Sequence, residues 1–500
     1  MDEIARARAE LLQLKEMEQD LLQNLSHVRM EIEVYKSRIE HLARAESPIN
    51  SLPLEILSYV LELVVPSTEY GDSRRSMSAL TKVSRAWRDI ILDSPKFWSN
   101  IHIDCSTPVS FVRTCVARCR QYPLDIKIKL GETNTHLATL IDVIIPHVCR
   151  WRTLEIYGND RQCLQVVLHK LNSFKFPSLT CATITVSAIR MHCPTFLKPD
   201  SSPALTSLNL NCLIPTEGFL PGQRITNLSL AFSLDRLELV MLPSLLASQH
   251  LTTLELQYSC SSALQPDSIS LPFLTSLTLR AQYPGNLISA LLAPQLSYFS
   301  LTRPSTPFAP SLSTVFHGCE SKFYNVRRFG LHYGADDSVS TVGCTISTMF
   351  PNARHVDLQT RDMNDFFRLS PDGSCPADNW ELLESLTFRE MKIRYESSPG
   401  PFVQWLRYWN SADLPMLRVK FVGCTFQSIS YGSDYSTPEW LLRLHDLLRE
   451  ICILDMVDVV LEATAHVSLT SASPPLLVRD VIMTGSVVFL ISHDLEIIRP

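Results

Sequence analysis

Glycine is scarce in this sequence, at 15 of 500 residues. This argues against folds that hold nucleotides on glycine-rich loops, and the motifs GxxxxGKS/T, GxGxxG, GxSxG and HExxH are all absent. Positive charge is not in excess either, because 45 Lys and Arg stand against 51 Asp and Glu. A net charge of −6 leaves no broad positive field for nucleic acid or an anionic membrane. The most apolar uncharged run near the C-terminus, residues 481–493, is too short to cross a bilayer and predicts a buried strand.

Paired cysteine motifs are missing as well. The 14 cysteines form no CxxC, and their tightest pair is Cys115 and Cys119. Neither this pair nor His192-Cys193 has a second pair of zinc ligands to complete a site. Zinc binding is therefore less favoured than core packing. The N-terminus MDEIARARAE lacks the apolar core of a signal peptide, so we expect reduced thiols in a cytoplasmic or nuclear protein. The acidic pair Asp336-Asp337 is expected in a solvated turn, and nothing predicts a cofactor or an active site of the chain's own.

A large core is what the composition does provide. Hydrophobic residues make up 45% of the chain and charged residues 19%, in 500 residues. That is enough apolar material for folded domains, and the length suggests about three units.

Residues 1–46 contain neither proline nor glycine and carry apolar residues with a period of seven. Two heptad series interleave: Ala7, Leu14, Leu21, Val28, Tyr35, Leu42, and Ile4, Leu11, Glu18, Leu25, Ile32, Ile39. Only Glu18 interrupts them. A strict heptad pattern predicts a coiled-coil helix, whose apolar stripe needs another helix against it. The partner is either a second copy of the chain, giving a homodimer through residues 1–46, or the chain's own next domain.

Short helices are predicted between residues 47 and 103. Pro53 lies in the first turn of one helix, and Leu57, Val60, Leu61 and Val64 form an apolar face along it. A second helix places Leu80, Val83, Trp87, Ile90 and Ile91 on one face, and Ser94-Pro95 opens a third that holds Phe97 and Trp98.

Three pieces of this segment occur in a specific order: LPLEIL at 52–57, VSRAW at 83–87 and FW at 97–98. In that order and spacing they resemble an F-box, and the chain as a whole resembles fungal-type F-box proteins. Ser84 stands where the family often has Cys, and the loop between the first two helices is somewhat long. The resemblance covers about a tenth of the chain. It implies binding to the Skp adaptor and, through it, to a cullin, with these expected contacts: Leu52, Pro53, Glu55, Ile56, Leu57, Val60, Val83 and Trp87.

From Trp151 onward one short phrase recurs, with apolar residues at its positions 0, 3 and 5. Its first anchors are Trp151, Leu179, Leu205, Ile225, Leu251, Leu274, Leu296, Val326, Ala353, Leu383 and Met416. The spacing averages about 26 residues, the length of a leucine-rich repeat. Each phrase predicts a strand, and 243–248 and 287–292 predict helical returns. Leucine-rich repeats usually have Asn or Cys eight residues after the first anchor, and here that position holds one only as Asn159 and Cys424. We therefore expect an irregular arc, in which other groups form the hydrogen bonds of the backbone turns.

The residue between the last two anchors of each phrase should point away from the core. These residues are mostly small, neutral or acidic: Glu155, Asn209, Ser229, Glu255, Thr278, Ser300, Gly330, Asp357 and Thr387. Nucleic acid would require Lys and Arg with interleaved aromatics, so a protein partner is favoured. An ordinary solvated sheet face is the alternative.

The expected fold mixes α+β and α/β repeat parts: a long N-terminal helix, a three-helix F-box and a degenerate leucine-rich-repeat solenoid with parallel strands. The expected boundaries are 1–46 for the coiled coil, 47–103 for the F-box, 104–149 for a connecting segment, 150–430 for the solenoid and 431–500 for a C-terminal cap. The cap should hold a helix from Thr437 to Cys452 and strands near 476–478 and 487–491.

The expected function is that of a non-catalytic substrate receptor in an SCF-type (Skp–cullin–F-box) ubiquitin ligase. The F-box would bind the Skp adaptor and the repeats an unknown protein substrate, with no role for nucleic acid or membrane. The alternative is a coiled-coil and repeat scaffold that acts outside any ubiquitin ligase.

Overall fold

The computed structural model describes residues 2–492 with gaps. The longest stretches outside the described residues are 65–72, 215–223, 232–241, 431–445 and 466–480. The chain divides into two compact units. Unit 1 comprises Met1–Trp98 and Arg118–Arg120, and unit 2 comprises Ser99–Ala117 and Gln121–Pro500.

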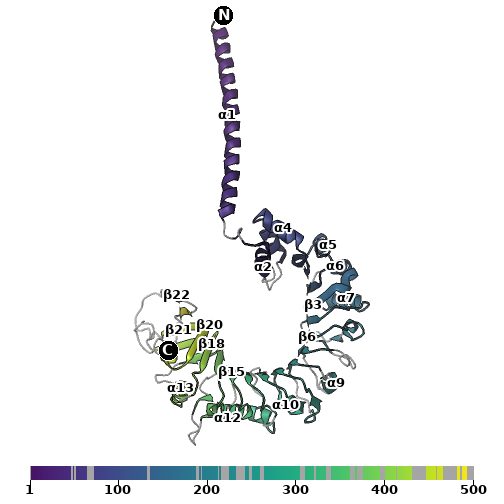
Figure 1. The fold of residues 1–500 in the computed structure, drawn as a ribbon, viewed down its shortest axis with the longest axis vertical. Coiled ribbons are helices and arrows are strands. Elements are labelled where there is room, and N and C mark those ends of the chain that lie inside the picture. The colour runs from purple at the N-terminus through teal and green to yellow at the C-terminus, as the bar shows by residue number, and fades with distance from the viewer. Residues whose placement is uncertain are drawn as a thin grey trace, which may run out of the picture. The chain divides into compact units, whose positions relative to one another are not determined.

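Unit 1 is helical (Figure 1). Its elements are α1 (Asp2–Glu46), α2 (Leu54–Val64), α3 (Ser73–Leu80), α4 (Arg85–Asp93) and the short 3-10 helix η2 (Pro95–Trp98). Ser84 caps α4 by accepting a hydrogen bond from the Trp87 backbone N–H at 3.1 Å.

The core of unit 1 is small and apolar. Its described buried apolar members are Leu57, Leu61, Met77, Ile91, Phe97, Trp98 and Cys119. The Trp98 indole donates to the Ile91 carbonyl at 2.7 Å, and the Arg118 guanidinium lies 4.6 Å from the centre of the Trp98 ring. These contacts satisfy the one polar atom of the indole and cover its face with a cation.

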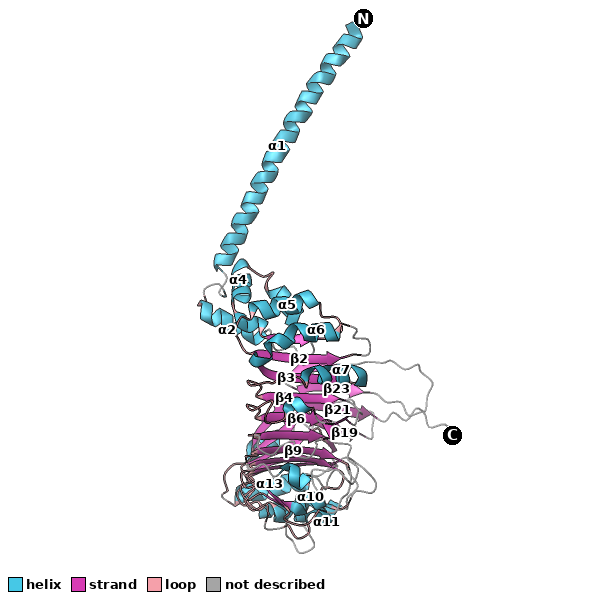
Figure 2. Cartoon of the chain, turned by 90° about the vertical axis from the view of Figure 1, so that its right-hand side faces the viewer, coloured by secondary structure: helices cyan, strands magenta, loops and turns pink. Residues whose placement is uncertain are grey.

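Unit 2 is built on a parallel sheet of 14 strands (Figure 2). In spatial order the strands are β1 (Asn100–Ile103), β2 (Leu124–Leu130), β3 (Trp151–Gly158), β4 (Cys181–Val186), β6 (Ser207–Asn211), β8 (Asn227–Ala231), β9 (Thr253–Tyr258), β11 (Ser276–Ala281), β13 (Tyr298–Arg303), β14 (Arg328–Tyr333), β15 (His355–Gln359), β16 (Ser385–Arg389), β18 (Arg418–Val422) and β20 (Ile453–Val457). Chain order equals spatial order, as in a solenoid-like α/β repeat.

Helices follow many of these strands and lie on the outer side of the curved sheet, which leaves its other face concave (Figure 1). The α-helices are α5 (Val109–Arg118), α6 (Leu137–Ile144), α7 (Arg161–Leu171), α9 (Leu242–Leu246), α10 (Gly285–Ala290), α11 (Leu312–Phe316), α12 (Val339–Met349) and α13 (Pro401–Ser411). The 3-10 helices are η3 (Ile145–Arg150), η4 (Thr195–Leu197) and η6 (Pro376–Asn379).

Smaller sheets form in the segments that follow strands of the main sheet. Two pairs are β5 (Met191–His192) with β7 (Leu213–Ile214), and β10 (Ile269–Ser270) with β12 (Leu291–Leu292). A five-stranded sheet has the order β17 (Lys392–Arg394), β19 (Thr425–Ser430), β21 (Val459–Ala465), β23 (Val487–Ser492) and β22 (Val481–Thr484).

The recurring phrase explains where most strands of the main sheet form. Each copy coincides with one strand from β3 to β18, and along β9 the buried residues Leu254 and Leu256 alternate with half-buried Thr253 and Glu255. The first anchors are buried just before their strands, as Leu251 is at 2% exposure. The last copy departs from this pattern. Met416, expected as its core anchor, is 53% exposed, and Leu417 is buried in its place.

Hydroxyl groups form a ladder of their own at the turns that enter the strands. Thr180, Thr206, Thr226, Thr252, Thr275 and Ser297 each follow an anchor, and each side-chain hydroxyl donates to a carbonyl of the preceding repeat at 3.1–3.2 Å. Within the series, Thr252 Oγ1 donates to the Thr226 carbonyl and Thr275 Oγ1 to the Thr252 carbonyl. The backbone N–H of the same residue donates there too, and in most of the series so does the next one, as Thr252 and Thr253 both donate to the Thr226 carbonyl.

The sheet extends past the expected range 150–430 at both ends. β1 and β2 come before it, so the segment 104–149 contributes a strand rather than only a connection, and β20 follows it. The prediction missed related spacings there, since Trp98, Ile101 and Ile103 at β1, and Ile451, Leu454 and Met456 at β20, are also apolar at positions 0, 3 and 5. In the expected cap, β23 covers the run 487–491, whereas Thr437, the helix start around it and the run 476–478 lie outside the described residues. Asp336-Asp337 and Cys193 lie outside them too.

Candidate functional site

Two surfaces carry the features expected of interaction sites. The first, here called the apolar edge, consists of Leu52, Leu54, Ile56, Tyr59 and Leu63 on and just before α2. Their exposed fractions are 37%, 63%, 49%, 59% and 58%, respectively. α2 presents apolar side chains on two sides. Leu57 and Leu61 fill the core of unit 1, while the apolar edge faces outward. An exposed cluster of this kind marks an interaction surface more often than chance exposure.

The expected adaptor contacts occupy different environments. Leu52, Pro53, Glu55 and Ile56 are exposed, and so is Val83. Val60 and Trp87 are half-buried. Leu57 was expected at the docking surface but is 5% exposed, because it is one of the few apolar side chains that can fill this small core.

Sequence reasoning missed Leu54, Tyr59 and Leu63. The signal was present, since Leu52, Ile56, Tyr59 and Leu63 recur at steps of three and four along a helix whose other side is already apolar. A helix that is apolar on two sides needs two partners. Only one of them is the core of unit 1.

The second surface is the concave face of the main sheet. The outward residues of the phrase fall into one row, because the strands pair in register: Glu155, Thr183, Asn209, Ser229, Glu255, Thr278, Ser300, Gly330, Asp357 and Thr387. Lys127 on β2 and Lys420 on β18 extend the row. Most of these side chains are half-buried, whereas Ser300 is 4% exposed.

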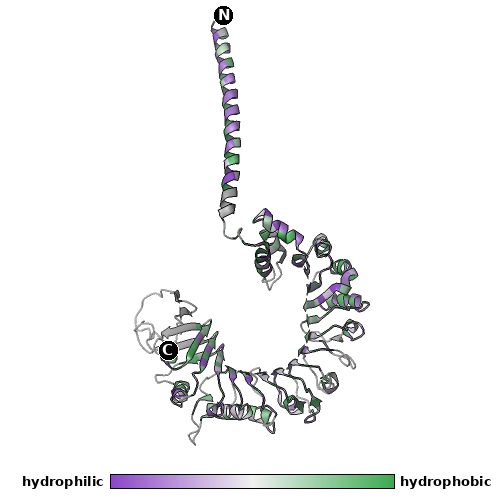
Figure 3. Cartoon of the chain, in the orientation of Figure 1, coloured by the Kyte–Doolittle hydropathy of each residue, from purple (hydrophilic) through white to green (hydrophobic). Residues whose placement is uncertain are grey.

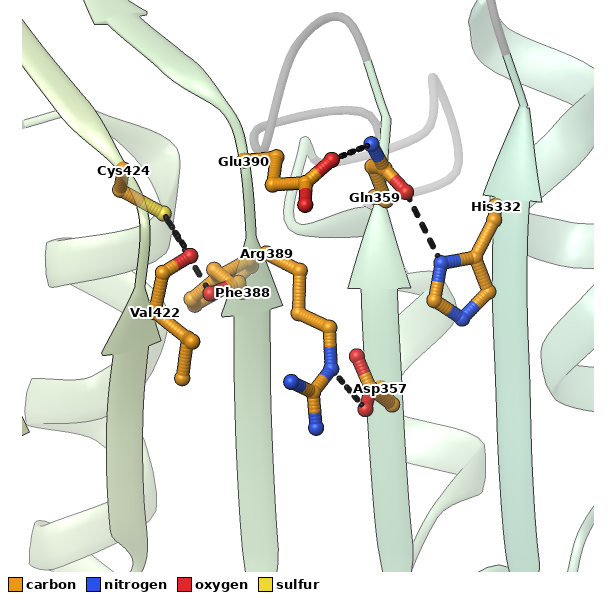
Figure 4. Close-up of polar contacts among 8 residues, drawn as sticks. All are labelled: His332, Asp357, Gln359, Phe388, Arg389, Glu390, Val422 and Cys424. Atoms are coloured by element: carbon orange, nitrogen blue, oxygen red, sulfur yellow. Dashed lines mark hydrogen bonds and ion pairs between the residues drawn. The ribbon is translucent and has the colours of Figure 1, made fainter. Parts of the chain in front are cut away.

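Polar contacts tie neighbouring strands together on this face (Figure 4). Arg389 on β16 forms an ion pair with Asp357 on β15, with Nε 2.6 Å from Oδ2. Gln359 links two strands, since its amide nitrogen donates to Glu390 at 2.9 Å and its oxygen lies 2.9 Å from His332 Nδ1. The polar groups are thereby held in fixed positions before any partner arrives, which lowers the entropy lost on binding.

Gly330 shapes the row between Ser300 and Asp357. A Cβ there would lie 3.0 Å from Ser300 Oγ and 3.5 Å from His332 Nε2. Beside it, Asp357 Oδ1 is buried without a hydrogen-bond partner among the described residues, while its other oxygen is held by Arg389.

Two cations of the concave face are left open. Arg328 and Arg418 are exposed, share one row with His355 and Ser385 between them, and form no side-chain hydrogen bond or ion pair within the described part of the chain. The nearby acids are engaged, as Glu384 is with Arg354 at 2.8 Å and Asp357 is with Arg389. The C-terminal third of this face therefore offers positive charge to a partner.

The described residues offer little for chemistry. Within them, no group of three or more His, Cys, Asp or Glu side chains is placed to hold a metal ion. Cys115 and Cys119 are buried in unit 2 and unit 1, respectively. Burial raises the pKa of Cys375 and of Cys452 to about 11, so both thiols stay protonated at neutral pH. Across the helices that the structure describes, none has the length and apolar character needed to cross a membrane.

Comparisons with known proteins leave the family open. No protein-family model matches the chain, and no curated protein does. Among solved structures, a crystal structure of a protein from Bacteroides fragilis is similar at 14% identity, with a TM-score of 0.29. The match covers 59% of this chain and 74% of that one. A likeness this low carries no argument about either fold or function.

Proposed function

We propose that this chain is the substrate-receptor subunit of an SCF-type ubiquitin ligase. Residues 47–103 would act as an F-box that docks on the Skp adaptor and, through it, on a cullin. The leucine-rich-repeat-like sheet of unit 2 would hold a protein target. The chain would contribute no catalysis, and its effect would be to raise the effective concentration of the target near the enzyme that transfers ubiquitin.

The observation that carries this proposal is the apolar edge. It begins in the LPLEIL segment, where the F-box resemblance implies adaptor contact, and continues along α2 to Leu63; Ile56 and Tyr59 are 49% and 59% exposed. Burying an exposed Leu or Ile stabilises a complex by about 1.5–3 kcal/mol. Covering several members of the edge supplies enough free energy for stable binding, even after the entropy cost of association.

The concave face supports the second half of the proposal. Its cross-strand pairs provide an ordered polar surface, and Arg328 and Arg418 add positive charge that no described side chain pairs with. We propose that the target presents an acidic segment to these two residues. Electrostatic complementarity of this kind sets partner choice and the rate of association more than affinity.

The adaptor interaction is tested with purified full-length chain and a Skp adaptor on gel filtration. We expect a stable complex, and we expect Leu52→Asp with Ile56→Asp to abolish it because two charges would be buried without partners. The matched control is Leu382→Asp with Met416→Asp, since those side chains are 48% and 53% exposed in unit 2. The control should bind normally.

Absence of any complex with the wild-type chain would refute the adaptor role and favour a scaffold outside the ligase. Loss of binding in the control as well would show that added charge alone is responsible, and the apolar edge would lose its assignment.

Target binding is tested by affinity capture from cells with the proteasome inhibited. We expect Arg328→Ala with Arg418→Ala to lose the captured targets while retaining the adaptor. Capture of the same targets at wild-type levels would contradict the placement of the target on this part of the concave face.

A further inference from the structure

α1 carries an apolar stripe that the chain itself leaves open. The stripe is formed by the two heptad series, and its described leucine, isoleucine, valine and tyrosine members are between 45% and 65% exposed. Polar and apolar residues alternate along this helix (Figure 3). At 45 residues α1 is roughly 68 Å long, so the stripe is a large unpartnered surface.

The residues beside the stripe identify the partner. In heptad lettering, Ile4, Leu11, Glu18, Leu25, Ile32 and Ile39 occupy a, and the other series occupies d. The g positions then hold Glu3, Glu10, Met17, Asn24, Glu31 and Arg38. The e positions hold Arg8, Lys15, Leu22, Arg29, Lys36 and Ala43. Acidic residues thus prevail on one flank of the stripe and basic residues on the other.

This segregation suits two identical helices that run in the same direction. In a parallel, in-register pair each g residue faces the e residue five positions later on the other helix. Glu3 then meets Arg8, Glu10 meets Lys15 and Glu31 meets Lys36 of the second copy, and no pair of like charges arises on the flanks.

The antiparallel arrangement is disfavoured by the same charges. It places g opposite g and e opposite e, so Glu10 and Glu31 would oppose each other, as would Lys15 and Lys36. Like charges at these positions oppose pairing. Lys36 Nζ lies 2.8 Å from Glu33 of its own helix, but both side chains are mostly exposed. Breaking this ion pair so that Lys36 can pair with Glu31 of a second copy therefore costs little free energy.

The seam favours two strands over more. Isoleucine at a with leucine at d, as at Ile39 and Leu42, is typical of two-stranded coiled coils. Glu18 also occupies an a position, so a parallel, in-register pair sets it against Glu18 of the second copy at a cost in stability. Met17 and Leu22 flank it and are 52% and 60% exposed, so they can widen the apolar contact around the glutamate.

We propose that α1 pairs with α1 of a second copy of this chain as a parallel, in-register, two-stranded coiled coil. The partner is the chain itself, held by the heptad stripe and selected by the Glu-to-basic pairs on its flanks. This assembly stands independently of the adaptor and target roles, because neither the apolar edge nor the concave face enters the argument.

The first experiment measures the molar mass of the full-length chain by light scattering or sedimentation. We expect twice the 56.5 kDa of one chain. Leu25→Asp with Ile32→Asp should restore the single-chain mass, because both are seam positions. The control is Leu12→Asp with Val34→Asp, on the outer side of the helix at 64% and 67% exposure, and it should remain dimeric.

Three results would overturn the pairing. They are a wild-type chain that stays monomeric at tens of micromolar concentration, a mass of three or more chains, and a dimer that survives the two seam aspartates.

A second experiment tests the flanking charges. Lys15→Glu with Lys36→Glu gives one full-length variant, and Glu10→Lys with Glu31→Lys gives the other. The homodimer of each variant should have a dissociation constant at least about tenfold above that of wild type, because the side chains at its g and e positions now carry like charges and repel. An equimolar mixture should form a mixed dimer at least as tight as wild type. Unchanged self-association of either variant would refute the charge selection.

A third experiment fixes direction. Donor and acceptor fluorophores are carried on an unnatural amino acid that replaces Ala9, which lies on the outer side of the helix. A parallel pair brings the two labels together and gives high transfer. An antiparallel pair places them about 40 Å apart, from the rise per residue of an α-helix, and low transfer would overturn the parallel assignment.

Discussion

At the scale of single residues, Gly158 ends β3 with a backbone that other residues avoid. Its φ is +143°, and a Cβ added there would lie 2.4 Å from the Leu130 carbonyl oxygen and 2.7 Å from Leu130 Cβ. Leu130 is its register partner on β2, so the close approach of two strands depends on the missing side chain. In a chain with only 15 glycines, this position shows where the conformation requires one.

We therefore expect Gly158→Ala to destabilise the β2–β3 pair by about 1–3 kcal/mol, because left-handed strain and a steric clash act together. The loss of stability is measured as faster hydrogen exchange in peptides covering residues 124–130 and 151–158. The matched control is Gly131→Ala, where an added Cβ meets nothing within 4 Å. Equal protection in the two variants would contradict this account of Gly158.

At the scale of elements, a ladder of hydroxyl groups joins consecutive repeats at the turns that enter the strands. Thr226 and Thr252 are half-buried, and their hydroxyls donate to the preceding repeat at 3.2 and 3.1 Å. At these turns the accepting carbonyl also receives two backbone N–H groups, as the Thr206 carbonyl does from Thr226 and Asn227.

Replacing Thr226 and Thr252 by Val removes the hydroxyls and keeps the branched shape. We expect each substitution to destabilise its pair of repeats by about 0.5–1.5 kcal/mol, the usual net value of an intramolecular hydrogen bond. Thr226→Ser with Thr252→Ser keeps the donors and should stay close to wild type. The measurement is the urea midpoint followed by circular dichroism. Should the Val and Ser variants unfold at the same midpoint, the ladder would be an incidental contact.

The strands and the ladder differ in how far the sequence predicted them. The strands from β3 to β18 followed from apolar residues at fixed spacing, which burial on one face of a sheet requires. The ladder residue was visible as the Thr after each anchor, but a hydroxyl next to a strand has many ordinary roles and its acceptor is not local. The predictions that Leu57 is exposed and Met416 is buried were wrong for a related reason. An apolar residue of a helix or of the phrase can lie on either of two faces, and tertiary packing decides which one is buried.

At the scale of the whole molecule, the main sheet is a one-dimensional stack in which each described strand pairs only with the strands before and after it. Aromatic clusters reinforce it at separate points. Phe299 lies 5.1 Å from Phe323 and 5.5 Å from Phe350, ring centre to ring centre, and its side chain is fully buried. Near the other end Phe176 lies 5.4 Å from Trp151 and 5.1 Å from Phe196. Such a stack should lose stability locally rather than all at once.

Phe299→Ala tests this behaviour because it leaves a cavity that costs about 3–5 kcal/mol at one point of the stack. We expect hydrogen exchange to accelerate in β11, β13, β14 and β15, while β2, β3 and β4 keep their protection. Phe176→Ala is the mirror experiment, and it should expose β3, β4 and β6 while sparing β13 and β14. If either substitution removes protection evenly from β2 to β18, the sheet unfolds as one cooperative body, and nearest-neighbour stacking does not describe the stability of unit 2.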